Sequence, residues 1–123
     1  ARLSYDLTVY AVRELDEAAF LSVVGTMTDL DVEDDGDGEV KIVRGEERAY
    51  AFTVFGPDPV ELDELPDEVL PLLSEPIAIW RVVVEGSDPD EFPAARRFAE
   101  TLATASGGVA FDEQTGSVLD RDA

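Results

Sequence analysis

Cysteine and histidine are both absent from the 123 residues of this chain. Their absence excludes disulfide bonds, thiol nucleophiles, imidazole bases and the common ligands of zinc. An enzyme of this composition would need a carboxylate pair or a metal site built from oxygen ligands alone. Aromatic residues make up only 8% of the chain, too few for an obvious sugar-holding cleft around paired carboxylates. We therefore expect a protein that is not an enzyme, with no catalytic residues, no cofactor and no bound metal.

Positive charge is also scarce. Nine basic residues, of which Lys41 is the only lysine, stand against 29 acidic residues, and the formal net charge is −20. This charge repels nucleic-acid phosphates and anionic membrane surfaces, so neither is expected as a partner. It attracts a basic protein and speeds the encounter with it. Acid-rich, lysine-poor surfaces also suit proteins of high-salt or high-GC organisms, and composition alone does not separate that adaptation from binding.

Long hydrophobic runs are missing as well. None approaches the roughly 18 residues of a membrane span. The first ten residues lack the basic-then-apolar order of a signal peptide, so a cytoplasmic protein is expected. Hydrophobic residues nevertheless make up 45% of the chain, which is enough to form the core of a single domain over residues 1–123.

Hydrophobic periodicity predicts a mixture of strands and helices. Alternating or β-branched segments predict strands at 3–12, 39–44, 48–56 and 76–86, a strand at 29–33 pairing with 39–44, and a hairpin at 109–120. Helical spacing predicts helices within 14–27 and 87–108, although Pro93 is expected to delay the second. Asp16 is the expected N-cap of the first helix, and Ser87 or Asp88 is the expected cap of the second, which Gly107 with Gly108 is expected to end.

The segment 57–76 carries five prolines and is predicted to be a loop with one short helix near Pro66–Leu70, broken by Pro71. The element order is therefore β-α-β-β, a strand and this link, then β-α-β-β. Each half contains a strand, an acidic turn and a helix start, with Asp16-Glu17 and Asp90-Glu91 in matching places. We predict the α+β class, specifically a ferredoxin-like sandwich in which a mostly antiparallel sheet carries two main helices on one face.

The densest acidic stretch, residues 31–40, has six carboxylates and two glycines in ten positions. The early positions resemble a calcium-binding EF-hand loop, with Asp31, Glu33 and Asp35 before Gly36. Ile42 stands where that loop needs a bidentate glutamate, and a strand rather than a helix should follow, so a specific calcium site is not expected. The alternatives left open are a solvated turn and a surface that attracts a basic partner.

A second acidic run, residues 61–68, is either the polar surface of a short helix or a further part of the same contact surface. Leu62, Leu65 and Leu70 would offer apolar anchors beside it. The residues predicted to contact a basic partner are Asp31, Glu33, Asp34, Asp35, Asp37, Glu39, Glu61, Asp63, Glu64, Asp67 and Glu68.

Arg81 interrupts the most hydrophobic predicted strand and supports an alternative interpretation. It should share a sheet face with Asp6 and Tyr10, and if that face is uncovered the three residues could bind a small ligand. A structural ion pair is the simpler role for Arg81. Trp80, on the opposite face, is expected in the core. Under this interpretation the chain is a ferredoxin-like small-ligand-binding or regulatory domain of a halophilic or high-GC organism, dimeric through its sheet.

The C-terminal segment 95–120 combines an alanine-rich helix, Gly-Gly, a short strand, Asp-x-Gln-Thr-Gly and a last strand. It resembles the ending of small bacterial immunity proteins encoded beside polymorphic or contact-dependent toxins. The resemblance covers about a fifth of the chain. It implies a small, acidic, non-enzymatic protein that binds a toxin, such as a nuclease, and blocks its active site. Such a toxin would be the basic partner that the charge also favours.

Overall fold

A computed structural model of the chain describes residues 4–27, 29–34, 39–60, 63, 65–73, 76–85 and 91–119. In chain order the elements are β1 (Ser4–Ala11), α1 (Glu17–Gly25), β2 (Leu30–Asp34), β3 (Glu39–Arg44), β4 (Ala49–Pro59), the short 3-10 helix η2 (Leu70–Leu72), β5 (Ala78–Glu85), α2 (Phe92–Ser106), β6 (Val109–Asp112) and β7 (Ser117–Val118). Among these residues, neither α1 nor α2 is long and apolar enough to cross a membrane.

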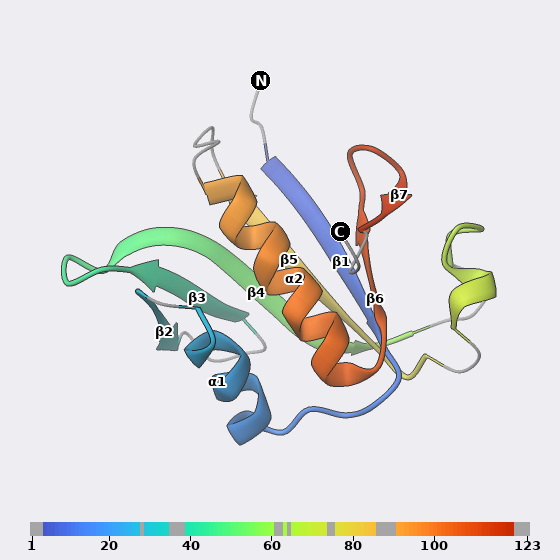
Figure 1. Ribbon diagram of the computed structural model, residues 1–123, viewed down its shortest axis with the longest axis horizontal. Coiled ribbons are helices and arrows are strands. Elements are labelled where there is room, and N and C mark those ends of the chain that lie inside the picture. Colours follow the sequence, from blue (N-terminus) through green and yellow to red (C-terminus); the bar gives the residue numbers. More distant parts are fainter. Residues whose placement is uncertain are drawn as a thin grey trace.

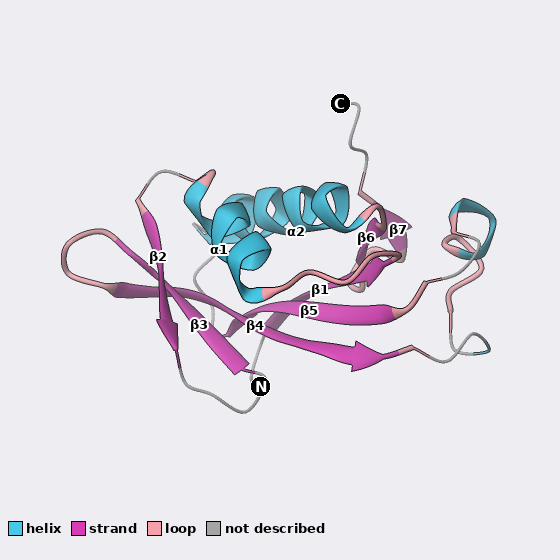
Figure 2. Cartoon of the chain, turned by 90° about the horizontal axis from the view of Figure 1, so that it is seen from below, coloured by secondary structure: helices cyan, strands magenta, loops and turns pink. Residues whose placement is uncertain are grey.

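One antiparallel sheet contains all seven strands, in the order β2-β3-β4-β5-β1-β6-β7 (Figure 1). Both helices lie on the same side of it (Figure 2). β4 pairs with β3 and β5, and so connects the paired strands β2 and β3 to the rest of the sheet, whereas β1 pairs directly with β5 and β6. The predicted α+β class and antiparallel sheet are confirmed. The sheet has more strands than the β-α-β-β-α-β unit of a ferredoxin-like fold, so that finer prediction is not confirmed.

Capping residues set the ends of the two helices. Asp16 caps α1, because its carboxylate accepts the backbone N–H of Ala19 at 2.8 Å, as predicted. α2 begins only at Phe92, with Pro93 in its first turn, since proline is tolerated where no N–H is needed. It ends at Gly107, which adopts a left-handed φ of 71°. The expected cap residues Ser87 and Asp88 lie outside the described residues.

The main core lies between the helices and the sheet. The Trp80 ring stacks on Phe20 of α1 with ring centroids 5.3 Å apart, and Phe98 of α2 packs against both Phe20 and Phe52. Trp80 is only 6% exposed, so its predicted core position is confirmed. The inward-facing residues of β1 join the same cluster, as their alternation predicted. Burial of these large side chains is the dominant stabilising contribution of the fold.

A second, smaller core lies on the opposite face of the sheet, under the proline-rich link. Leu65, Val69 and Leu73 of the link pack on Tyr10 and on strand β6. The link is therefore a loop with one short helix, as predicted, and it also covers part of the sheet, which the sequence did not predict. The short helix predicted at 66–70 is instead η2, two to four residues later, and contains Pro71, which fits its first turn. Strand β4 also runs through Pro57 to Pro59, beyond the predicted end at residue 56.

Candidate functional site

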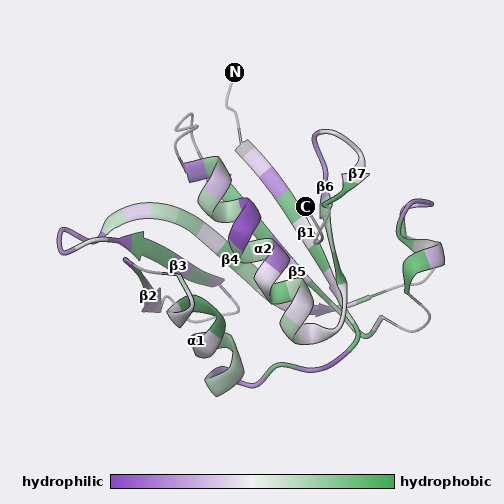
Figure 3. Cartoon of the chain, viewed as in Figure 1, coloured by the Kyte–Doolittle hydropathy of each residue, from purple (hydrophilic) through white to green (hydrophobic). Residues whose placement is uncertain are grey.

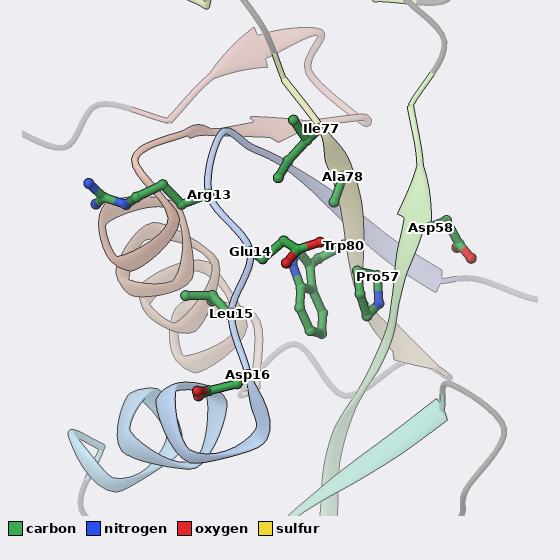
Figure 4. Close-up of a pocket in the computed structure, with 9 residues that line it drawn as sticks. All are labelled: Arg13, Glu14, Leu15, Asp16, Pro57, Asp58, Ile77, Ala78 and Trp80. Atoms are coloured by element: carbon green, nitrogen blue, oxygen red, sulfur yellow. The ribbon is translucent and has the colours of Figure 1, made fainter.

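A pocket of about 530 Å³ lies at one end of the sheet, where the loop between β1 and α1 crosses the ends of β4 and β5. Figure 4 shows its lining residues, which are Arg13, Glu14, Leu15, Asp16, Pro57, Asp58, Ile77, Ala78 and Trp80. The pocket therefore combines aliphatic and aromatic walls with charged groups, the usual composition of a binding site.

Backbone hydrogen bonds fix the loop that forms one wall of the pocket. The N–H groups of Val12 and Arg13 both donate to the carbonyl of Ser106, at 3.0 and 2.8 Å. The N–H of Ile77 donates to the carbonyl of Ala11 at 2.8 Å and so anchors the start of β5 beside this loop. Residues far apart in the chain are thereby held around one preformed cavity.

The charged groups of the pocket are not equally available. One carboxylate oxygen of Asp16 is occupied by the N-cap hydrogen bond. The guanidinium of Arg13 donates to the carbonyl of Ala105 at 3.4 Å and lies against Gly107, so it points toward the end of α2. Figure 4 shows Arg13 directed away from the cavity and Glu14 directed toward Trp80. Glu14 and Asp58 are both exposed, but Asp58 pairs with Ile79 and its carboxylate is directed away from the cavity in Figure 4, so Glu14 is the acidic group directed toward Trp80.

Trp80 forms the floor of the pocket rather than an open aromatic platform. One side of its ring stacks on Phe20, at an interplanar angle of 14°. A Cβ atom added to Gly56 would lie 3.3 Å from the ring, so backbone lies close there too. Ile77, in contrast, is 45% exposed at the rim. A ligand would therefore meet the aliphatic rim and Glu14 first.

The structure separates the two predicted acidic runs. Asp31, Glu33 and Glu39 lie on β2 and β3, whereas Asp63, Asp67 and Glu68 lie on the link. These segments are at opposite ends of the long axis in both ribbon views (Figures 1 and 2). All except the half-buried Glu39 are exposed. Of the remaining predicted contact residues, Asp34 lies in β2, but its side chain is not described. The others, Asp35, Asp37, Glu61 and Glu64, lie outside the described residues. Within the described residues, the two runs do not form one surface.

Asp31 has a structural role at the edge of the sheet. The N–H of Gly45 donates to the carbonyl of Asp29, so these residues form a hydrogen-bonded pair between the two strands. Hydrogen-bonded and non-hydrogen-bonded pairs alternate along an antiparallel ladder. The N–H and carbonyl groups of Val32 therefore point away from β3, toward the open edge of the sheet. The Asp31 carboxylate accepts the Val32 N–H at 2.8 Å, and Arg48 donates to the Val32 carbonyl at 3.2 Å and to Asp31 at 3.1 Å. These bonds, the Val32 N–H first and then Arg48, lower the pKa of Asp31. The contact also blocks edge-to-edge pairing at Val32.

The calcium-loop interpretation finds no support in the strands that flank residues 35–38. β2 and β3 pair as an antiparallel hairpin, whereas an EF-hand places a helix on each side of its loop. Among the described residues, no three acidic side chains lie together in a way that could hold a metal ion. Figure 3 shows hydrophilic colour instead on the turn between β3 and β4, which carries Glu46, Glu47 and Arg48.

Asp6, Tyr10 and Arg81 share the sheet face opposite the helices, as predicted. Thr8 of β1 pairs with Arg81 of β5, which places Arg81 between the levels of Asp6 and Tyr10. Arg81 is exposed, and its guanidinium carbon lies 5.4 Å from the centroid of the Phe55 ring. Tyr10, however, is only 6% exposed because the link packs over it. Asp6 and Arg81 therefore remain accessible, whereas Tyr10 belongs to the second core.

Because Tyr5 and Tyr10 are buried, we expect the free energy of unfolding to fall in alkaline solution. Burial first, and neighbouring carboxylates second, raise the pKa of each tyrosine from 10.0 to about 12. The folded state therefore holds these protons more tightly than the unfolded state. Their stabilisation is complete below pH 10 and should be lost as the pH rises from about 10 to 12. Urea unfolding at several pH values should show this fall, and Tyr10→Phe should reduce its slope. An unchanged slope would contradict the assignment.

Glu14 and Asp58 are the acidic lining residues that the sequence did not single out. They are distant in the chain, and the loop before α1 and the end of β4 bring them to opposite sides of the same pocket. The available sequence signal was the acidic Glu14-Leu15-Asp16 directly after an amphipathic strand. The chain matches no protein-family model, and a search of curated proteins found no significant match. Its function is therefore inferred from its own residues.

Proposed function

We propose that this chain is a cytoplasmic, non-enzymatic protein that binds and masks a basic protein partner. The observation that carries the proposal is that cations near the exposed carboxylates are engaged inside the protein. Arg44 donates to the largely buried Glu91 at 2.8 and 3.1 Å, Arg48 closes the sheet edge, and Arg13 turns toward α2. Carboxylates such as Glu14, Glu33 and Asp58 remain exposed. This imbalance favours association with a cationic surface.

An immunity protein that neutralises a toxin is the most specific form of this proposal. Its support is the resemblance of segment 95–120 to the ending of such proteins. In that segment α2 is followed by Gly107 and Gly108, β6, a turn and β7, which is the pattern on which the resemblance rests. A neighbouring gene encoding a large secreted protein with a basic C-terminal domain would support this form. A neighbourhood without any such gene would leave only the general proposal.

The salt dependence of association tests the general proposal. We expect a nona-arginine peptide to bind at 50 mM KCl, with an association rate that falls at least about tenfold by 500 mM, because exposed charges are screened. Stopped-flow fluorescence of Trp80, the single tryptophan, provides the signal. A nona-glutamate peptide is the control and should not bind. Equal rates at both salt concentrations, or binding of both peptides, would contradict the proposal.

A ferredoxin-like regulatory domain adapted to high salt is a second candidate. The placement of the two acidic runs at opposite ends favours it, because adaptation spreads acids over a surface. Under this alternative the accessible Asp6 and Arg81 would be the small-ligand site and the open sheet face would form a dimer. The free energy of unfolding in potassium chloride separates the candidates. Unfolding at low salt with rescue at molar salt would favour adaptation, whereas a folded protein at 50 mM KCl favours partner binding.

A further inference from the structure

We propose that the outer face of the sheet, opposite the helices, binds a second copy of this chain and so forms a two-fold symmetric dimer. Both helices lie on the other side of the sheet (Figure 2). Within the part of the chain that the structure describes, the link covers only the end of the outer face around Tyr10, Ile79 and β6. The rest of that face, across β3, β4, β5 and the first half of β1, is the proposed dimer face. The inference goes beyond both candidate functions and depends on neither.

A bulge in β4 turns an aromatic side chain onto the dimer face. Tyr50 and Phe52 pair with consecutive residues of β3, so Ala51 is one extra residue in β4. Residues two apart in a regular strand share a face, and Tyr50 would otherwise lie beside Phe52 in the main core. Instead, the Tyr50 hydroxyl lies 2.8 Å from the hydroxyl of Thr53, whose strand partner Val83 is on the outer face, and Tyr50 is 38% exposed. Bulges that redirect a side chain are typical of functional surfaces.

The side chains around Tyr50 have the composition of an interface core. Phe55 and Val83 are half-buried, and the guanidinium carbon of the exposed Arg81 lies 5.4 Å from the centroid of the Phe55 ring. Tyrosine, phenylalanine and arginine are more frequent at interface cores than on the rest of a protein surface. The centre of the dimer face therefore offers large side chains that a flat partner can cover.

Two rows of paired residues cross the dimer face, and each row matches its own reverse. In the strand order β3-β4-β5-β1, the first row is Lys41, Thr53, Val83 and Asp6, and the second row is Glu39, Phe55, Arg81 and Thr8. A two-fold axis between β4 and β5, parallel to the strands, reverses this order in the second copy. Lys41 would then face Asp6 of the second copy, and Arg81 would face Phe55 of the second copy. Each contact would occur twice, because a two-fold interface repeats every contact.

Charge favours a second copy over other partners at this face. The two rows contain two acidic and two basic residues, so their charges cancel, whereas the chain as a whole carries −20. A net charge of this size repels another copy wherever carboxylates meet carboxylates. A basic partner would meet Arg81 at the centre of the face, and an acidic partner would meet Asp6 and Glu39. A second copy presents the same charges in reversed order and therefore pairs both signs.

Sedimentation equilibrium of the whole chain, between 10 and 500 µM, tests the dimer. We expect a monomer–dimer equilibrium whose dissociation constant falls at least about threefold from 50 to 500 mM KCl, because salt screens the repulsion between two chains of net charge −20. The binding of nona-arginine is expected to change in the opposite direction over the same range. The two salt dependences therefore distinguish the dimer from the proposed function.

Exchanging the charges at the ends of the first row tests the symmetry of the contact. Lys41→Glu and Asp6→Lys each place like charges opposite one another in the dimer, so each variant alone should dimerise at least about fivefold more weakly. An equimolar mixture of the two variants restores both ion pairs and should dimerise with nearly the affinity of the unsubstituted chain. This recovery needs two different chains, so a folding defect in either variant does not produce it.

Asp67→Lys is the matched control for Asp6→Lys, because Asp67 is exposed on the link and the net charge changes equally. It should leave dimerisation at least as strong as in the unsubstituted chain. A chain that stays monomeric at 500 µM and 500 mM KCl, equal weakening by Asp67→Lys, or a mixture without recovery would overturn the dimer face. Nona-arginine binding is measured separately, so its result decides the proposed function whichever way the dimer test falls.

Discussion

Replacing Gly108 with alanine is expected to lower the free energy of unfolding by about 4 kcal/mol or more, a large part of the stability of a domain this size. The added Cβ would overlap the carbonyl oxygen of Tyr10 and lie only 3.0 Å from the Cα of Ala11. Both obstacles are backbone atoms of a central strand, so no side-chain rotation relieves the overlap. Gly108 also donates to the carbonyl of Ala103 at 2.8 Å, which fixes its position at the end of α2.

Gly116→Ala is the control for this prediction. Gly116 has a φ of 70°, but a Cβ there would meet nothing within 4 Å. Its replacement should cost only the left-handed backbone penalty, about 1 kcal/mol. Urea unfolding followed by circular dichroism measures both variants. A Gly108→Ala protein as stable as Gly116→Ala would show that β1 and the end of α2 do not approach as closely as described.

Asp112→Ala carries the second large expected effect, a loss of about 2 to 4 kcal/mol. Asp112 is 2% exposed and organises the turn before β7. One carboxylate oxygen accepts the Tyr5 hydroxyl at 2.7 Å, and the other accepts the N–H groups of Gln114 at 2.9 Å and Thr115 at 3.3 Å. Alanine would leave the hydroxyl of the largely buried Tyr5 and the two turn N–H groups without their acceptor.

Asp112→Asn separates hydrogen bonding from charge at this position. Its amide oxygen can still accept from the turn, and its NH₂ group can donate to the Tyr5 oxygen, so the loss should be about 1 kcal/mol. The two variants are compared by the same urea unfolding. Equal losses in both would mean that the negative charge, rather than the hydrogen bonds, stabilises the turn. Wild-type stability in Asp112→Ala would contradict the structural role altogether.

Local sequence chemistry predicted most of the secondary structure. The alternation in β1, the Asp16 cap and the glycines after α2 all act through neighbours along the chain, and each was confirmed. The proline-rich link was predicted as a loop with one short helix, and the structure places that helix at Leu70–Leu72, but the packing of the link could not be predicted. Only Tyr10 and β6, distant in sequence, provide the surface on which Leu65, Val69 and Leu73 pack.

The candidate site was harder to predict than the fold. The sequence shows where acidic residues cluster. It does not show which of their carboxylates already accept hydrogen bonds from other groups of the protein. Asp31 stood in the densest run, and it bonds Val32 and Arg48 at a sheet edge. Glu14 and Asp58 stood in shorter, less conspicuous stretches, and the loop before α1 and the end of β4 brought them to opposite sides of one cavity. Tertiary contacts therefore decide which acidic groups remain available for a partner.

The central claim is that the exposed carboxylates bind a basic partner. The most direct test is to map which residues of the protein a cationic ligand perturbs. Backbone ¹H–¹⁵N shifts of the chain would be followed during titration with nona-arginine at 150 mM KCl. We predict that the largest changes fall on and beside the exposed carboxylates Glu14, Glu33 and Asp58, with small changes at Asp31, whose carboxylate already accepts from Val32 and Arg48. Shifts of equal size at all exposed acidic positions, or no shifts at this salt concentration, would contradict the account.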